Sequence, residues 1–285
     1  MIDRPDSTDR PGLDRVALTE LAGTGPWTAI EVRDEVGSTN AEITELARRG
    51  VDEGAVITAE SQSAGRGRAD RGWVSPPRAG IAVSMLLRPR VSPARWSWLP
   101  LLAGVSLAET VTEVSGVRAA LKWPNDLLVS QPPHGEPRKT AGILAEVAAG
   151  AVALGIGLNV TLTKEELPRP DTTSLQLAEA STVDRTLLLT GLLTRLGRRY
   201  QAWVAVDGDP IASRLRRDYL TWCHTIGQDV RVMLPDGGEP TGTATDIDRD
   251  GRLCVDTTDG RIAVAAGDVH HVRLRKIENV RTTRH

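Results

Sequence analysis

The chain has 285 residues, 40% of them hydrophobic and 25% charged, which is enough for a sizeable core in one large domain or in a large and a small one. Its 35 basic and 37 acidic residues give a formal net charge of −2, which excludes a global field that would draw the protein to nucleic acid or to a membrane. The sequence has no signal peptide, no run of about 18 apolar residues, and two cysteines without metal-ligand or disulfide spacing. We therefore expect a reduced, cytoplasmic protein without a membrane span.

The N-terminal part of the chain differs in composition from the rest of the sequence. Residues 1–26 are rich in Asp, Arg, Pro and Gly and predict a poorly ordered lead-in with one short helical patch at 13–21. Apolar residues then alternate over 27–36, which predicts a first strand.

A polar turn comes after this strand and precedes a predicted helix over 41–49. The turn contains Ser38, Thr39 and Asn40, and Ser38 or Thr39 can cap the helix. The same three side chains, at the start of a helix and beside the end of a strand, could instead bind a ligand. Both interpretations stay open at this point.

Glycines and arginines alternate after a short buried strand at 55–59, in the stretch that we call the Gly/Arg segment, residues 60–73. Glycines let the backbone bend and approach a ligand closely, and arginines offer forked donors for phosphate or carboxylate. A Trp at the end of the segment can stack on a planar base. The alternatives are a solvated basic turn or an Arg-Gly tract that binds RNA. The residues concerned are Gly65, Arg66, Gly67, Arg68, Arg71, Gly72 and Trp73.

Apolar patterning places the remaining elements in two groups. We expect strands at 80–87, 117–123, 127–129, 141–148 and 151–158, and helices at 96–114, from Asp171, at 184–206 and at 210–222, with a Pro-rich loop at 130–138. From residue 226 on, Asp-Gly turns separate short strands at 230–234, 239–246, 253–257 and 261–265. This second group predicts a small β-barrel of roughly 50 residues.

Three further stretches carry candidate chemistry. Lys122-Trp123-Pro124-Asn125-Asp126 could supply a phosphate contact, a base contact and a Mg²⁺ ligand, or it could simply be a turn. Lys139 begins an apolar strand, either as a solvated end or as a cation that neutralises a carboxylate and a phosphate. Gly155 and Gly157 fall on one side of a strand, where they could form a flat wall for a ligand.

Several familiar sites are excluded. The sequence contains no GxxxxGK[ST] phosphate loop, no Gly-x-Ser-x-Gly elbow and no His-Glu-x-x-His or paired-Cys metal site. Gly155-Ile156-Gly157 lacks the third glycine and the following helix of a dinucleotide fingerprint. What remains is a nucleotide pocket made from the Gly/Arg segment, a strand-end Asn-Asp and a Lys.

Taken in order over residues 27–275, these motifs resemble those of the biotin protein ligases. The motifs are Gly37-Ser38-Thr39-Asn40, Gln62 with Ala64-Gly65-Arg66-Gly67-Arg68, Trp73, Lys122-Trp123-Pro124-Asn125-Asp126, Lys139 with Ala141-Gly142-Ile143-Leu144, and Gly155-Ile156-Gly157-Leu158-Asn159. The resemblance implies an α+β fold of the class II synthetase and biotin/lipoyl ligase type, with a mixed central sheet flanked by helices and then an SH3-like barrel. We therefore expect a catalytic domain at 27–222, the barrel at 226–275 and a tail at 276–285.

The resemblance also implies residue roles. Lys139 and Arg68 would be catalytic and Asp126 would hold Mg²⁺. The biotin site would comprise Ser38, Thr39, Asn40, Gln62, Gly65, Arg66, Gly67, Arg68, Lys139, Gly142, Leu144, Gly155 and Gly157. The ATP site would comprise Arg68, Arg71, Trp73, Lys122, Asn125 and Asn159.

The implied reaction activates biotin with Mg-ATP to biotinyl-5′-AMP and then biotinylates a lysine of a biotin carboxyl carrier protein of a carboxylase. Because the lead-in is too short for a winged helix, we expect no DNA binding and no repressor activity, and we expect a monomer or weak homodimer. The rivals are a lipoate or octanoate ligase, whose run of consecutive glycines after paired arginines is absent here, and an RNA-binding protein.

Overall fold

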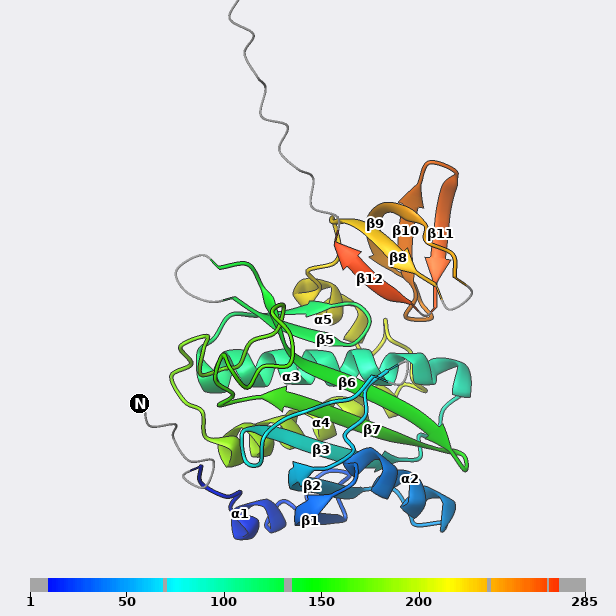
Figure 1. Ribbon diagram of the computed structural model, residues 1–285. Helices are drawn as coiled ribbons and strands as arrows, with labels where there is room; N and C mark the ends of the chain where they lie inside the picture. The colour runs from blue at the N-terminus through cyan, green and yellow to red at the C-terminus, as the bar shows by residue number, and fades with distance from the viewer. Residues whose placement is uncertain (1–9, 69–70, 131–134, 235–236, 266, 272–285) are drawn as a thin grey trace, which may run out of the picture.

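The central feature of the molecule is a seven-stranded sheet, in which the chain's apolar runs pair with one another (Figure 1). The structure is a computed structural model that describes residues 10–68, 71–130, 135–234, 237–265 and 267–271. Strands β1 and β2 pair in parallel and the other neighbours are antiparallel, so the sheet is mixed as expected. Its order is β1 (Ala29–Val36), β2 (Ala55–Gln62), β3 (Gly80–Leu87), β7 (Ala151–Asn159), β6 (Arg138–Ala148), β5 (Asp126–Val129) and β4 (Ala119–Lys122).

Helices cover the two faces of this sheet differently. The long helices α3 (Leu99–Ser115) and α4 (Arg185–Val204) pack with one face into the main hydrophobic core. Helix α3 can approach the sheet closely because it has small residues: a Cβ on Gly104 would lie 3.3 Å from Leu121 of β4. The other face carries the shorter α2 (Thr39–Arg48), which packs in a smaller apolar cluster and leaves much of that face free for a site.

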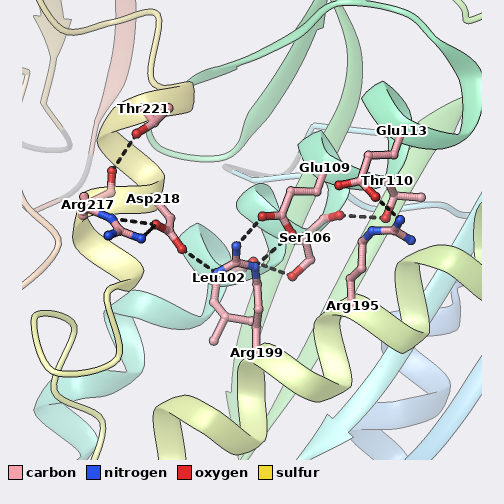
Figure 2. A network of polar contacts seen from close by, with 10 residues as sticks. All are labelled: Leu102, Ser106, Glu109, Thr110, Glu113, Arg195, Arg199, Arg217, Asp218 and Thr221. Carbon is pink, nitrogen blue, oxygen red and sulfur yellow. Dashed lines mark hydrogen bonds and ion pairs between the residues drawn. The ribbon is translucent and has the colours of Figure 1, made fainter.

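A charged network joins the helices on the α3/α4 face (Figure 2). Arg199 of α4 reaches Glu109 of α3 and Asp218 of α5 (Leu215–Trp222), and all three side chains are more than three-quarters buried. Although burial alone would raise it, hydrogen bonds from Arg217 and Arg199 hold the pKa of Asp218 below its usual range. The network therefore ties three helices together with satisfied charges.

The described part of the predicted lead-in is ordered, which corrects our expectation for residues 10–26. Helix α1 (Arg15–Thr19) is capped by Asp14, and its Leu18 is fully buried. The backbone N–H of Leu13 donates to Glu60 over 2.6 Å, and Glu60 is also paired with Arg185 at 2.7 Å. The composition, rich in Asp, Arg, Pro and Gly, suggested disorder, but tertiary contacts to the end of β2 hold this segment in place. Residues 1–9 lie outside the described part of the chain.

A five-stranded antiparallel sheet forms the C-terminal unit, in the order β11–β10–β9–β8–β12. Its strands are β8 (Asp229–Met233), β9 (Thr241–Ile247), β10 (Leu253–Thr257), β11 (Gly260–Val264) and β12 (Asp268–His271). The unit is fastened to the larger one by indole donors, because Trp98 and Trp123 bond the carbonyls of Arg249 and Gly251. The predicted fold class, a mixed sheet with helices followed by a small antiparallel β unit, is confirmed.

Most element boundaries agree with the sequence prediction, and three points differ. The helix expected from Asp171 is wrong: Thr172 instead forms a bridge to Lys139 at the start of β6. The helix expected at 210–222 begins only at Leu215, and β12 was not predicted. Some predictions lie outside the described residues. They are residues 131–134 of the predicted loop, the C-terminal boundary expected at 275, and the whole tail. The domain boundaries themselves remain predictions.

Among the helices that the structure describes, none is both long and apolar enough to cross a lipid bilayer.

Candidate active site

A cavity of about 140 Å³ opens on the face of the sheet that carries α2. It lies between the start of α2, the middle of β6 and β7, and the Gly/Arg segment. Most of the predicted site residues line it together, although they are spread over more than 120 positions of the sequence. They are Ser38, Thr39, Asn40, Gln62, Arg66, Gly67, Arg68, Arg71, Trp73, Asn125, Lys139, Gly142, Leu144, Gly155, Gly157 and Asn159.

The polar end of the cavity is built at the start of α2. Ser38 caps this helix, since its side chain accepts from the N–H of Ala41. Thr39 donates from its backbone to Gln62 over 2.9 Å, and its hydroxyl lies 3.2 Å from Gln62 and 2.8 Å from Ser84. The capping interpretation is therefore correct for Ser38, while Thr39, Gln62 and Ser84 form a hydrogen-bonding cluster at the cavity wall.

The Gly/Arg segment folds back on itself as a short hairpin over the cavity. Arg66 and Gly72 pair across it, and the N–H of Trp73 donates to the carbonyl of Gly65 over 2.9 Å. Gly65 does not line the cavity, but a Cβ there would lie 2.3 Å from the Trp73 carbonyl oxygen. Gly65 is thus required by the hairpin and not by direct contact with the cavity. Residues 69 and 70 lie outside the described part.

The arginines of the segment reach across to two other elements. Arg68 donates to the side chain of Asn125 at 3.2 Å and to the carbonyl of Gly267 at 3.5 Å, and Arg71 pairs with Asp268 of β12 at 2.9 Å. Burial lowers the pKa of the Arg68 guanidinium; Asp268 opposes this shift and Arg71 adds to it. The site therefore holds a desolvated cation that an anionic ligand would stabilise.

The indole of Trp73 packs closely against the glycines of the central strands. Its indole atoms are 2.4 Å from where a Cβ on Gly157 would stand and 3.2 Å from where one on Gly142 would stand. Any side chain at Gly157 would displace the ring. The glycine wall predicted from the sequence is thus present, with Trp73 packed on it.

A second group of charges lies next to the cavity at the ends of β4, β5 and β6. Lys139 is paired with Asp126 at 2.6 Å, an ion pair without the geometry of a directed hydrogen bond. Burial lowers the pKa of Lys122; Asp126 opposes this shift and Lys139 adds to it. Lys139 lines the cavity, whereas Asp126 and Lys122, both predicted as site residues, lie just behind the lining. Two cations and one carboxylate are suited to bind phosphate with a divalent ion.

Metal binding requires ligands beyond Asp126. Within the described ranges, no three His, Cys, Asp or Glu side chains gather in a way that could hold a metal ion. Mg²⁺ is commonly bound by one or two carboxylates plus substrate phosphates, so a single Asp beside the cavity fits that arrangement.

The structure adds cavity residues that the sequence reasoning missed. Ser84 was hidden in an apolar run, Thr172 was assigned to a helix start, and Pro168 and Arg169 were not singled out. Glu146 lies behind the lining and contacts two lining residues, Asn40 and Arg66. A charged residue within the otherwise apolar run 141–148 was the available signal for Glu146.

Two family models match the chain. The Biotin/lipoate A/B protein ligase family matches residues 35–162, which include the cavity strands and the Gly/Arg segment, and the Biotin protein ligase C terminal domain matches residues 225–272. A biotin--[acetyl-CoA-carboxylase] ligase of Mycobacterium tuberculosis is 42% identical over 93% of this chain and 97% of its own length. The chain belongs to the biotin protein ligase family.

Other members of the family are similar over most of the chain. The bifunctional ligase/repressor BirA of Bacillus subtilis is 30% identical over 83% of this chain and 72% of its own length. The solved biotin protein ligase of Aquifex aeolicus in complex with biotin and ATP is 25% identical, with a TM-score of 0.69 over 87% of this chain and all of that one. The family relationship therefore extends across both the catalytic sheet and the C-terminal unit.

Proposed function

We propose that this chain is an ATP-dependent ligase that activates biotin as biotinyl-5′-AMP and transfers it to a lysine of a biotin carboxyl carrier domain of a carboxylase. The observation that carries the proposal is the meeting of neutral hydrogen-bonding side chains and cations in one cavity. Thr39 and Gln62 line this cavity, and so do Arg68 and Lys139. Such a site suits a ligand that is polar at its ring and anionic at its tail.

We assign the polar end to biotin. Its ureido group would bond Ser38, Thr39 and Gln62, and Asn40 would complete that end. The ring would lie against Leu144 and Gly155, and against Gly142 and Gly157 once the Trp73 indole that packs on them has moved. Gly65, Arg66 and Gly67 belong to the segment that would cover it. The support is positional: apart from Gly65, all of these residues line one cavity.

We assign the cationic end to the nucleotide. The adenine would pack on the free face of Trp73, and Asn125 and Asn159 would lie around the ribose and base. Arg68, Arg71 and Lys122 would bind phosphates. In the structure, Asn125 Nδ2 donates to the carbonyl of Ile143 and Asn159 Nδ2 to that of Thr173, so both amides are already oriented.

The first step joins two anions. A carboxylate oxygen of biotin attacks the α-phosphorus, the bond to the bridging oxygen breaks, and pyrophosphate leaves. Lys139 would bridge the carboxylate and the α-phosphate, with Arg68 offsetting the remaining charge, and each well-aimed donor contributes about 3 kcal/mol to such a transition state. Mg²⁺ held by Asp126 would supply further charge neutralisation on the phosphates.

The second step transfers biotin to the carrier. The lysine amine attacks the carbonyl carbon of the mixed anhydride, AMP leaves with the electron pair of the C–O bond, and the amine loses a proton. Since the anhydride hydrolyses in water, the Gly/Arg segment would have to stay closed until the carrier arrives.

We also propose a cytoplasmic enzyme that acts as a monomer or weak homodimer. ATP and carboxylase subunits are cytoplasmic substrates, and the two cysteines, Cys223 and Cys254, are both free and buried.

The decisive experiment is mass spectrometry of purified protein incubated with biotin and Mg-ATP, followed by addition of a carrier domain. We expect a bound species with the mass of biotinyl-AMP, and then a carrier heavier by one biotinyl group. Lipoate and octanoate serve as matched substrates. Adenylation of lipoate or octanoate but not of biotin would contradict the proposal and support a lipoate ligase.

A further inference from the structure

Glu146 on β6 lies between the cavity wall and the Gly/Arg segment. One of its carboxylate oxygens, Oε2, accepts a short hydrogen bond from the side-chain amide of Asn40, and the other, Oε1, is 3.3 Å from Nη1 of Arg66. Asn40 is 3% exposed and belongs to α2, whereas Arg66 is half-exposed and belongs to the hairpin. A single carboxylate thus connects a buried side chain of the cavity with the segment that covers it.

The chemistry of the carboxylate determines which way Asn40 points. An ionised carboxylate only accepts hydrogen bonds, so the NH₂ of Asn40 has to face Glu146. Its carbonyl oxygen is then directed the other way, toward Gly155, where a Cβ would lie only 2.4 Å from that oxygen. This Oδ1 atom is buried and has no hydrogen-bond partner among the described residues. A buried acceptor without a partner is costly, and a ligand N–H would satisfy it.

We propose that Glu146 is a positioning residue that couples the ligand end of the cavity, through Arg66, to the described residues 65–68 and 71–73 of the hairpin. Through Oε2 it turns the acceptor of Asn40 toward an N–H of the bound ring, and through Oε1 it holds Arg66, and with it the hairpin, over the same ring. This inference rests on the proposed function, because the N–H donor is taken to be the ureido group of biotin.

The two contacts support one another through their charge. Without a carboxylate, Asn40 could rotate and present its NH₂ to the cavity, where it would repel an N–H donor. Without Arg66, the carboxylate would keep Asn40 in place but would no longer hold the hairpin. Removing the charge of Glu146 should therefore impair both ligand affinity and retention, while removing Arg66 should impair mainly retention.

The test begins with calorimetric titration of biotin alone into the full-length protein. Glu146→Gln keeps the size of the side chain and removes its charge, and we expect its affinity for biotin to fall about tenfold. The matched control is Glu113→Gln, which removes a carboxylate paired with Arg195 on the α3/α4 face and should leave the affinity unchanged. Equal affinity of Glu146→Gln and the unchanged protein would overturn the inference. Failure of the unchanged protein to bind biotin would instead overturn the proposed function.

A second measurement separates positioning from a general loss of structure. The release rate of biotinyl-AMP is followed after its formation in Arg66→Gln, Glu146→Gln and the double variant. We expect each single variant to release the adenylate about tenfold faster, and the double variant to be no more than about threefold faster still, since both changes break one contact. Independent, multiplicative effects would overturn the coupling. Because Arg66 is half-exposed, we expect Arg66→Gln to keep the fold, so the proposal stays testable even if Glu146→Gln does not fold.

Discussion

The two faces of the central sheet are made by the same strands, yet they differ in almost every property. On the α3/α4 face, β6 and β7 present Ile143, Leu154 and Ile156, all buried in the main core. On the cavity face, the alternate positions include Gly155 and Gly157. Because side chains of a strand alternate between faces, one short stretch of sequence can stabilise the fold on one side and shape a site on the other.

The charges of the two faces differ in the same way. Arg199, on the α3/α4 face, has two carboxylate partners and is 17% exposed in its side chain. On the cavity face, Arg68 is desolvated, and its hydrogen-bond partners among the described residues are neutral, at 3.2 and 3.5 Å. A satisfied buried network contributes to stability, whereas an unsatisfied cation is available to a substrate. Changes on one face should therefore alter unfolding, and changes on the other should alter catalysis.

The largest expected effect comes from a substitution on the cavity face, which should impair catalysis and leave stability nearly unchanged. Arg68→Ala should lower the rate of biotin-dependent adenylate formation by about 10²- to 10³-fold, because a donor aimed at developing negative charge is lost. The melting temperature should change little. Pyrophosphate exchange measures the rate, and Arg90→Ala, at an exposed surface position, is the control. Adenylate formation at the normal rate in Arg68→Ala would refute its role.

The second effect should be confined to the α3/α4 face. Arg199→Ala leaves the mostly buried Glu109 without its cation and leaves Asp218 with the exposed Arg217 alone, and we expect the free energy of unfolding to fall by about 2 kcal/mol. Urea denaturation measures this change, while kcat/KM for biotin should be unaffected. Arg217→Ala removes an exposed partner of Asp218 and should cost less than about 0.5 kcal/mol. A similar loss in both variants would show that burial does not set the cost.

A smaller effect tests whether the glycine wall is specific to the cavity face. In Gly157→Ala the new Cβ would collide with the Trp73 indole, so the ring should move and the KM for ATP should rise about tenfold. The control is Gly191→Ala on α4, where the nearest atom is the mobile end of Arg195. Fluorescence of the tryptophans on ATP addition gives an independent reading. An unchanged KM in Gly157→Ala would mean that Trp73 does not contact the nucleotide.

The smallest expected effect is the dependence of stability on acidic pH through Asp218. The folded-state pKa of Asp218 is below its unfolded value, so its contribution to stability is fully present above about pH 4 and is lost as the pH falls through the folded pKa. We expect Asp218→Asn to be less stable than the unchanged protein at pH 7, and the difference to shrink as the pH falls below about 4. Urea denaturation over a series of pH values from 7 downward measures the difference. A constant difference would contradict the assigned shift.

Much of this arrangement could be predicted from local patterns. Apolar runs located the strands of the central sheet, and combinations of Gly, Arg, Lys and Asn indicated part of the cavity lining, because both depend on neighbours in sequence. Gln62, Gly142 and Leu144 were expected there only from the resemblance to the biotin protein ligases. The helix expected from Asp171 failed because the backbone of Thr172 pairs with Lys139, a contact between residues far apart in the chain. Glu146 was missed for the same reason: its contacts are with Asn40 and Arg66, each about 80 or more positions away in the sequence.

Composition was a poor guide where tertiary contacts decide order. Asp14 caps α1, and Leu13 and Leu18 are buried, although the surrounding sequence is rich in Asp, Arg and Pro. The strand β12 was too short to stand out by alternation, yet it pairs with β8 along its whole length. Its Asp268 then provides the partner for Arg71, so a strand that the sequence did not reveal contributes to the site.

Residues 10–18 contact the end of β2, and this contact has a practical consequence for any shortened version of the enzyme. A version trimmed to begin at β1 would expose the Glu60–Arg185 pair to water and discard two buried leucines, each contributing about 2 kcal/mol. Glu60 stands two positions before Gln62, which lines the cavity, so the damage would spread from the trimmed end toward the cavity. Engineered versions of this chain should therefore keep residues 10–18, and any fusion partner should be joined before them.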